Sequence, residues 1–174
     1  MHLLLTGKPG VGKTTVIKRA LEGLTDFKIA GFFTEEIREG RKRVGFKLKL
    51  VPGGEEGVLA HRDSSSPYRV GRYGVEVGAF EEKVIPHLKK ALQEKVDIMI
   101  LDEIGAMELM SQTFKKLVKG FLKKDVPRVL GTLQQRSRYL LMEWSVAERV
   151  NLIEVTEKNR DSLVAQVLKW AISK

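Results

Sequence analysis

The chain contains no cysteine, and this absence excludes disulfide bonds, thiolate metal sites and cysteine nucleophiles. A chain without cysteine is compatible with a reducing compartment, and we expect the protein in the cytoplasm because its first residues do not have the pattern of a signal peptide. Asparagine is nearly absent as well, since it occurs only at Asn151 and Asn159. Together with a charged content of 30%, the scarcity of this heat-labile residue favours a thermophilic source.

Long hydrophobic runs are also missing. No segment approaches the roughly 18 consecutive apolar residues that a membrane-spanning helix needs, so we expect no membrane partner. The apolar run at residues 3–5 leads at once into a glycine-rich loop, which is not the pattern of a signal peptide. The chain has 174 residues, of which 43% are hydrophobic, and this is enough to bury one substantial core. Because the sequence has no repeats or linkers, we interpret residues 1–174 as a single domain.

The glycine-rich loop fits a known phosphate-binding pattern. Residues 7–14 match G-x-x-x-x-G-K-[ST] directly after a short apolar strand, which is the setting that this motif requires. The glycines let consecutive backbone N–H groups point inward at the phosphates of a nucleoside triphosphate. We expect Lys13 to contact the β- and γ-phosphates as a catalytic residue, Thr14 to bind Mg²⁺ and Thr15 to touch the α-phosphate. The predicted loop consists of Gly7, Lys8, Pro9, Gly10, Val11, Gly12, Lys13 and Thr14.

A second apolar strand ends in a pair of acidic residues. The segment 97–103 delivers Asp102 and Glu103 at its C-terminal end, where ligands bind in open α/β sheets. Asp102 is predicted to hold the Mg²⁺ ion through its water shell, and Glu103 to polarise a water for attack on the γ-phosphate. The alternative interpretation is that the two acidic residues only cap the following helix.

Strands alternate with helices along the chain, which predicts an α/β fold with a mainly parallel sheet flanked by helices. The expected strands are 2–6, 29–34, 97–103, 129–132 and 152–155, and the expected helices are 13–21, 79–94, 111–122, 138–148 and 160–172. Between them, apolar and polar residues alternate over 44–50 after a turn at Glu39 and Gly40, which predicts an inserted antiparallel β-hairpin. Short strands at 58–61 and 73–77 complete the pattern.

Some polar residues permit two interpretations. Thr132 ends a predicted strand, where its hydroxyl either senses the γ-phosphate or is buried and satisfied. Four arginines stand near predicted site loops and act either as a charge-stabilising finger or as ordinary surface residues. These four are Arg69, Arg72, Arg136 and Arg138. Asn159 or Arg160 contacts the base or ribose in one interpretation. In the other, Asn159 caps the last helix.

Five segments spread over the whole chain resemble the THEP1 family of nucleoside-triphosphatases. They are 34–38 (TEEIR), 43–46 (RVGF), 70–75 (VGRYGV), 102–109 (DEIGAMEL) and 156–160 (TEKNR). The resemblance implies a P-loop NTPase domain with a RecA-like sheet and Mg²⁺-dependent hydrolysis of several nucleoside triphosphates. It also implies nucleotide contacts in a second segment, which consists of Ile98, Met99, Ile100, Leu101, Asp102, Glu103, Ile104 and Gly105. The chain departs from the family at Ala106, where members often carry lysine, and at 132–134, where they often have a Thr-x-Pro-like turn.

We therefore expect hydrolysis of ATP, GTP and other nucleoside triphosphates to diphosphate and phosphate. The Asn-Lys-x-Asp motif of guanine-specific sites is not found after the last strand, which favours broad base tolerance. One alternative is a nucleotide or small-molecule kinase, which needs an acceptor pocket and usually an arginine-rich lid. The basic segment 38–43 could be misread as such a lid, but the position of Glu103 favours water as the acceptor. A second is a nucleic-acid-stimulated ATPase, because the formal net charge is +9. The basic residues are dispersed along the chain, so a solvated surface that attracts anionic nucleotides is favoured over a nucleic-acid interface.

Overall fold

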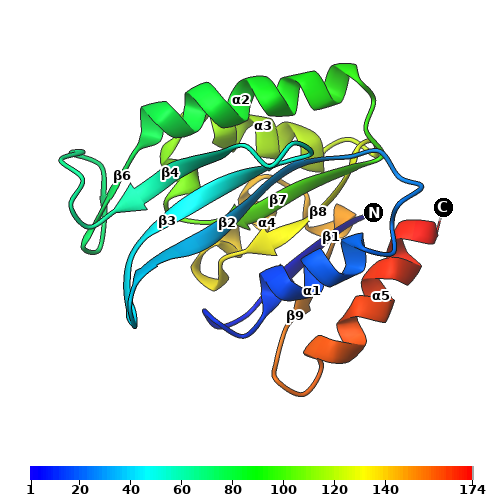
Figure 1. Cartoon of the computed structure of the whole chain (residues 1–174). Coiled ribbons are helices and arrows are strands. Elements are labelled where there is room, and N and C mark those ends of the chain that lie inside the picture. Colours follow the sequence, from blue (N-terminus) through cyan, green and yellow to red (C-terminus); the bar gives the residue numbers. More distant parts are fainter. Residues whose placement is uncertain (174) are drawn as a thin grey trace.

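A computed structural model describes residues 1–173 as one nine-stranded sheet with helices on both faces (Figure 1). The strands are β1 (His2–Thr6), β2 (Ile29–Glu39), β3 (Lys42–Val51), β4 (Glu56–His61), β5 (Arg69–Val70), β6 (Tyr73–Val75), β7 (Ile98–Ile104), β8 (Arg128–Leu133) and β9 (Val150–Glu154). The α-helices are α1 (Lys13–Leu21), α2 (Val77–Gln93), α3 (Gln112–Leu122), α4 (Tyr139–Glu143) and α5 (Arg160–Ile172). Short 3-10 turns are η1 (Glu108–Met110), η2 (Gln135–Ser137) and η3 (Ala147–Arg149).

The strands follow the order β5-β6-β4-β3-β2-β7-β8-β1-β9 across the sheet. β2, β7, β8, β1 and β9 run parallel, and this half of the sheet carries both sequence motifs. β1 is buried along its whole length, as is typical of parallel strands that helices cover on both faces. Because β8 lies between β1 and β7, its C-terminal end stands between the glycine-rich loop and the acidic pair. The expected RecA-like, mainly parallel sheet is confirmed.

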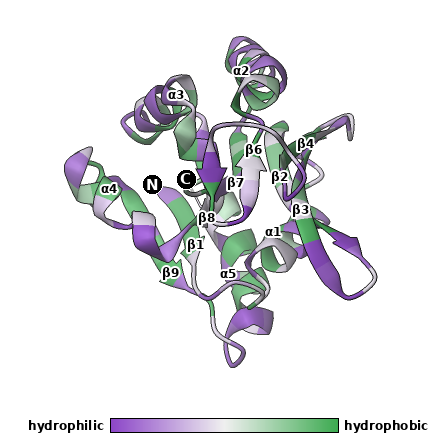
Figure 2. Cartoon of the chain, turned by 90° about the vertical axis from the view of Figure 1, so that its left-hand side faces the viewer, coloured by the Kyte–Doolittle hydropathy of each residue, from purple (hydrophilic) through white to green (hydrophobic). Residues whose placement is uncertain are grey.

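Each face of the sheet has its own core, because successive side chains of a strand point to opposite faces. Leu4 packs with the apolar residues of α2, α3 and α4, whereas Leu3 and Leu5 pack with those of α1 and α5. Figure 2 shows these two helical layers on either side of the strands. The chain has no helix among residues 1–173 that is long and apolar enough to cross a membrane.

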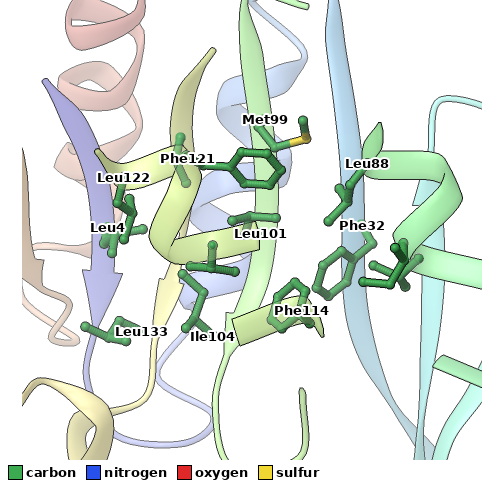
Figure 3. Packing of buried hydrophobic residues seen from close by; sticks show 14 of the residues in the cluster. Leu4, Phe32, Leu88, Met99, Leu101, Ile104, Phe114, Phe121, Leu122 and Leu133 are labelled. Atoms are coloured by element: carbon green, nitrogen blue, oxygen red, sulfur yellow. The ribbon is translucent and has the colours of Figure 1, made fainter. Parts of the chain in front are cut away.

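An aromatic cluster anchors α2 and α3 to β2. The rings of Phe32, Phe80 and Phe114 meet edge to face, with centroids 5.2 to 5.8 Å apart. Figure 3 shows Phe32 and Phe114 close together in this core, with Leu101 and Ile104 of β7 nearby. Each such pair contributes about 0.5–1.5 kcal/mol beyond the burial of its area. The cluster thus holds both helices firmly on the strand next to β7.

The expected antiparallel hairpin is present. β2 pairs with β7 through its first residues and with β3 from Gly31 onward, so one strand joins the parallel and antiparallel halves of the sheet. The hairpin is longer than expected, because pairing continues to Glu39 and Lys42 at its tip. β4, β6 and β5 extend the antiparallel half to the far edge of the sheet.

The helix expected over 138–148 is wrong in length. α4 ends at Glu143, and Ser145 then takes a left-handed backbone conformation with φ 55. The chain continues through η3 into β9, which begins at Val150 and not at residue 152. Trp144 and Val146 are both buried, so the apolar spacing of the segment continues although the helix has ended. The strand expected over 73–77 is also shorter, because it ends at Val75 and α2 begins at Val77.

Candidate active site

The glycine-rich loop connects β1 to α1 in a conformation that depends on glycine. Gly7 has φ 144, and a Cβ atom at this position would stand 2.7 Å from the carbonyl oxygen of Val155. Gly12, with φ 106, forms the N-cap of α1. The first turn of α1 contains no acidic residue, so the positive end of the helix dipole is available to an anion. Gly7, Gly10 and Gly12 all have positive φ, a conformation that residues other than glycine rarely adopt, as the sequence motif predicts.

Lys13 folds back over this loop. Its ammonium donates to the carbonyl oxygens of Gly7 and Lys8, at 3.1 Å each. The charge therefore lies beside the loop backbone, in the place from which it is expected to meet a phosphate chain. Thr15 is exposed next to it and lies on the wall of a neighbouring cavity.

Asp102 connects three elements at the C-terminal edge of the sheet. The Thr14 hydroxyl of α1 donates to Asp102 Oδ2 at 2.7 Å, and the Thr132 hydroxyl of β8 donates to Oδ1. Burial raises the pKa of Asp102, while the hydrogen bonds from Thr132 and Thr14 oppose that shift. Thr132 is wholly buried, so the interpretation of its hydroxyl as buried and satisfied is the observed one.

The donor set at this point fits a magnesium ion. Mg²⁺ prefers oxygen ligands and is usually bound by one or two carboxylates together with substrate phosphates. Thr14 and Asp102 bring a hydroxyl and a carboxylate oxygen within 2.7 Å of each other beside the glycine-rich loop. No cluster of three or more metal-binding His, Cys, Asp or Glu side chains occurs within residues 1–173.

Glu103 follows Asp102 at the end of β7, and the peptide bond between them is cis. Burial raises the pKa of Glu103, the charge of Asp102 raises it further, and Lys13 opposes both effects. A carboxyl with a raised pKa is better matched to proton transfer near neutral pH. The acidic pair does not cap the next helix, because the Ser111 hydroxyl caps α3 by accepting from the Phe114 N–H at 3.0 Å.

The expectation of nucleotide contacts along the whole of 98–105 stays a prediction, and the burial of the segment limits which side chains can make them. The side chains of five residues in this segment are completely buried between the helical layers and have no exposed surface for a ligand. These are Ile98, Met99, Ile100, Leu101 and Ile104. Within this segment only Glu103 is partly exposed, while Asp102 and Gly105 lie buried beside it. The apolar residues of β7 support the site from inside the core.

Two polar residues beside the acidic pair were not predicted as site residues. Glu108 of η1 is only 5% exposed, and Gln134 follows β8, with its amide oxygen accepting from the Ala106 N–H at 2.9 Å. For Glu108, the sequence offered one indication of a buried acidic residue, because it is the only charged residue in the otherwise apolar segment 107–110. Gln134 carried no local signal, because its place depends on the position of β8 next to β7.

A cavity of about 340 Å³ lies between the glycine-rich loop, α1 and the start of α5. Its walls are formed by Gly10, Gly12, Thr15, Val16, Arg19, Arg160 and Asp161. Arg160 therefore lies next to the phosphate loop, and its contact with a base or ribose stays a prediction. Asn159 makes no side-chain cap bond to α5, and its amide instead joins Thr156 and the carbonyl of Glu154 at 2.8 and 2.9 Å. It fixes the loop before α5.

The remaining arginines divide into two groups. Arg69 and Arg72 belong to the β5–β6 end of the sheet, far from β1 in strand order, and bond to backbone carbonyls there. For this pair the surface interpretation holds. Arg136 lies in η2 after β8, and Arg138 pairs with Glu154 of β9 at 3.3 Å. The basic segment 38–43 spans the β2–β3 turn and makes ion pairs with Glu36.

Comparison with known proteins places these features in a family. The NTPase family model matches residues 2–168. The nucleoside-triphosphatase THEP1 of Thermotoga maritima is 44% identical over 168 residues, which cover 97% of this chain and 94% of that protein. The crystal structure of THEP1 from Aquifex aeolicus superposes with a TM-score of 0.88 at 35% identity, covering 99% of this chain and all (100%) of that one. The solution structure of a human cancer-related nucleoside triphosphatase gives 0.80 at 34% identity, with 99% and 98% covered. The resemblance read from the sequence is thereby confirmed, and the chain belongs to the THEP1 family of nucleoside-triphosphatases.

Proposed function

We propose that this chain hydrolyses nucleoside triphosphates to diphosphate and phosphate in the presence of Mg²⁺, with broad tolerance of the base. The observation that carries the proposal is the contact of 2.7 Å between Thr14 and Asp102 beside the phosphate loop, with Glu103 next in the chain. The names of the relatives, nucleoside-triphosphatases, support the same reaction. We also propose the cytoplasm as its location, with which a chain without cysteine is compatible.

The phosphate chain is bound by the loop 7–14 in this proposal. The backbone N–H groups and the N-terminus of α1 receive the negative charge, and Lys13 moves from the loop carbonyls to the β- and γ-phosphate oxygens. Thr14 and Asp102 would hold Mg²⁺, which, when bound, neutralises charge that develops on the phosphates. Thr132 holds the Asp102 carboxylate in the required orientation.

Glu103 acts as the general base. It orients a water for in-line attack on the γ-phosphorus and accepts its proton as the bond to the leaving diphosphate breaks. Burial favours this role because it raises the pKa of the carboxyl. Glu103→Gln should retain nucleotide binding and lose turnover by roughly 10²-fold or more.

We place the nucleoside in the cavity beside Arg160. The planar guanidinium of an arginine stacks on the face of any base without reading its edge, which supports broad base tolerance. The phosphates would then extend from this cavity past Thr15 into the loop. An Arg160→Ala variant should therefore weaken binding of all four nucleoside triphosphates to a similar extent.

The deciding experiment measures phosphate release from ATP, GTP, CTP and UTP with and without Mg²⁺. Each reaction is repeated with added nucleoside monophosphates and with single-stranded nucleic acid, and the products are separated by chromatography. Diphosphate and phosphate from all four substrates, unaffected by either addition and abolished by a chelator, is the expected result. Diphosphate formed from an added monophosphate would instead identify a kinase, and strong stimulation by nucleic acid would identify a nucleic-acid-coupled ATPase.

A further inference from the structure

Glu108 is a buried carboxyl to which the proposed reaction assigns no task. It opens the 3-10 turn η1, only five residues after the end of the acidic pair, and is 5% exposed. Within residues 1–173 no lysine, arginine or histidine forms an ion pair with it. Burying an acidic side chain without a cationic partner lowers the stability of the folded state. Such a residue is therefore a candidate for a functional role.

Three side-chain oxygens converge on one point beside Gly105. A Cβ atom placed on this glycine would lie 3.1 Å from Glu103 Oε1, 3.2 Å from Glu108 Oε2 and 3.4 Å from the amide oxygen of Gln134. These oxygens come from the end of β7, from η1 and from the residue after β8. Because position 105 is glycine, a side-chain oxygen of Glu103 and one of Glu108 can both approach the same point beside its Cα atom.

Burial, together with the charges of Glu103 and Asp102, raises the pKa of Glu108 well above its usual value. A neutral carboxyl has an O–H group to donate, which makes it a partner for a neighbouring ionised carboxylate. The turn that carries Glu108 is itself anchored on two sides. Gln134 accepts from the N–H of Ala106, and the Leu109 N–H donates to the carbonyl of Gly105 at 2.9 Å.

We propose that Glu108 is a positioning residue that holds the Glu103 carboxylate toward the attacking water, with Gln134 fixing the backbone between them. The inference rests on the proposed function, in which Glu103 is the general base. Loss of such a neighbour leaves the base free to rotate away from its water, and displacements of about 1 Å at a reacting group are enough for large losses in rate. We expect nucleotide binding not to depend on Glu108, because its side chain is buried and does not line the cavity beside the phosphate loop.

The test uses five variants of the full chain: Glu103→Gln, Glu108→Ala, Glu108→Gln, the double variant Glu103→Gln with Glu108→Ala, and Ser111→Ala as a control. Ser111 caps α3 directly after η1, so its loss disturbs the same segment without touching Glu103. Each variant is assayed for kcat and KM with MgATP, for binding of a fluorescent ATP analogue, and for thermal unfolding.

We expect Glu108→Ala to lower kcat by roughly 10-fold or more with KM and analogue binding unchanged. Glu108→Gln should restore kcat to within about threefold, because the amide keeps the shape and a donor group. The double variant should be no slower than Glu103→Gln alone, since Glu108 acts only through Glu103. Ser111→Ala should lower the melting temperature and leave kcat unchanged.

The outcomes separate this inference from the proposed function. Full turnover in Glu103→Gln would overturn the role of the base and the positioning role with it. An inactive Glu103→Gln variant together with a fully active Glu108→Ala variant would overturn the positioning role alone. The positioning role would also be refuted if Glu108→Gln were as slow as Glu108→Ala in a folded protein, or if the losses of the two single variants multiplied in the double variant.

Discussion

Replacing Thr132 by valine tests the buried network around Asp102. The Thr132 hydroxyl is wholly buried and donates a hydrogen bond to Asp102 Oδ1, while the Thr14 hydroxyl donates to Oδ2 of the same carboxylate. Valine has nearly the same shape as threonine, so the substitution removes one hydrogen bond and leaves the packing between β1 and β7 in place. Asp102 remains buried with one donor fewer.

The size of the effect follows from this burial. A hydrogen bond to a buried group contributes about 1 kcal/mol when both partners are neutral and about 1.5–3 kcal/mol when one is charged. For a domain of this length, 1 kcal/mol corresponds to about 2–4 °C in melting temperature, so we expect Thr132→Val to melt roughly 3–10 °C lower. Because Thr132 orients the expected magnesium ligand, the Mg²⁺ concentration for half-maximal activity should rise by about 10–100-fold.

The assay is thermal unfolding followed by a Mg²⁺ titration of phosphate release. Thr6→Val is a matched control, because Thr6 ends the adjacent strand β1, is 1% exposed and has a hydroxyl without a hydrogen-bond partner within residues 1–173. Removing an unpaired buried hydroxyl should leave the melting temperature unchanged or raise it. Equal melting temperatures and equal Mg²⁺ requirements for Thr132→Val and Thr6→Val would refute this prediction. They would mean that the hydrogen bond from Thr132 to Asp102 stabilises neither the fold nor the binding of Mg²⁺.

Three further predictions concern the loop and the buried acid. Lys13→Ala should weaken binding of a fluorescent ATP analogue by at least about 10-fold in a fluorescence titration, because a charge-assisted contact to the phosphates is lost; intact affinity would contradict the phosphate-loop assignment. Gly7→Ala should lower the melting temperature, since its Cβ would stand 2.7 Å from the Val155 carbonyl oxygen, whereas Gly10→Ala, with open space around it, should cost less. The raised pKa of Glu108 means that its stabilising contribution is complete below the unfolded value of about 4.5 and is lost as the pH rises toward the folded pKa. Glu108→Gln should therefore gain stability relative to the original chain between pH 4 and 8, which melting curves across that range measure; a constant difference would count against the raised pKa.

Local patterns were enough to predict the phosphate loop, the parallel strands and the hairpin. The loop 7–14 is encoded within eight consecutive residues, so its motif is recognisable without knowledge of distant segments. β7 is recognisable because a strand covered on both faces needs a continuous apolar run. Local periodicity failed over 138–148, where Trp144 and Val146 are buried by tertiary contacts although the chain leaves the helix at Ser145.

The sequence by itself determined that a phosphate-binding motif lies at a strand-to-helix turn and that an acidic pair lies at a strand end. Only the tertiary structure decided that Thr14 meets Asp102 across 88 residues and that Thr132 donates to the same carboxylate. It also decided that side-chain oxygens of Glu103, Glu108 and Gln134 approach one point beside Gly105. The reason is physical: a motif within one loop is encoded by neighbouring residues, whereas contacts between strand ends depend on the strand order. In this fold that order inserts β8 between β1 and β7, and it is set by the burial of both faces of the whole sheet.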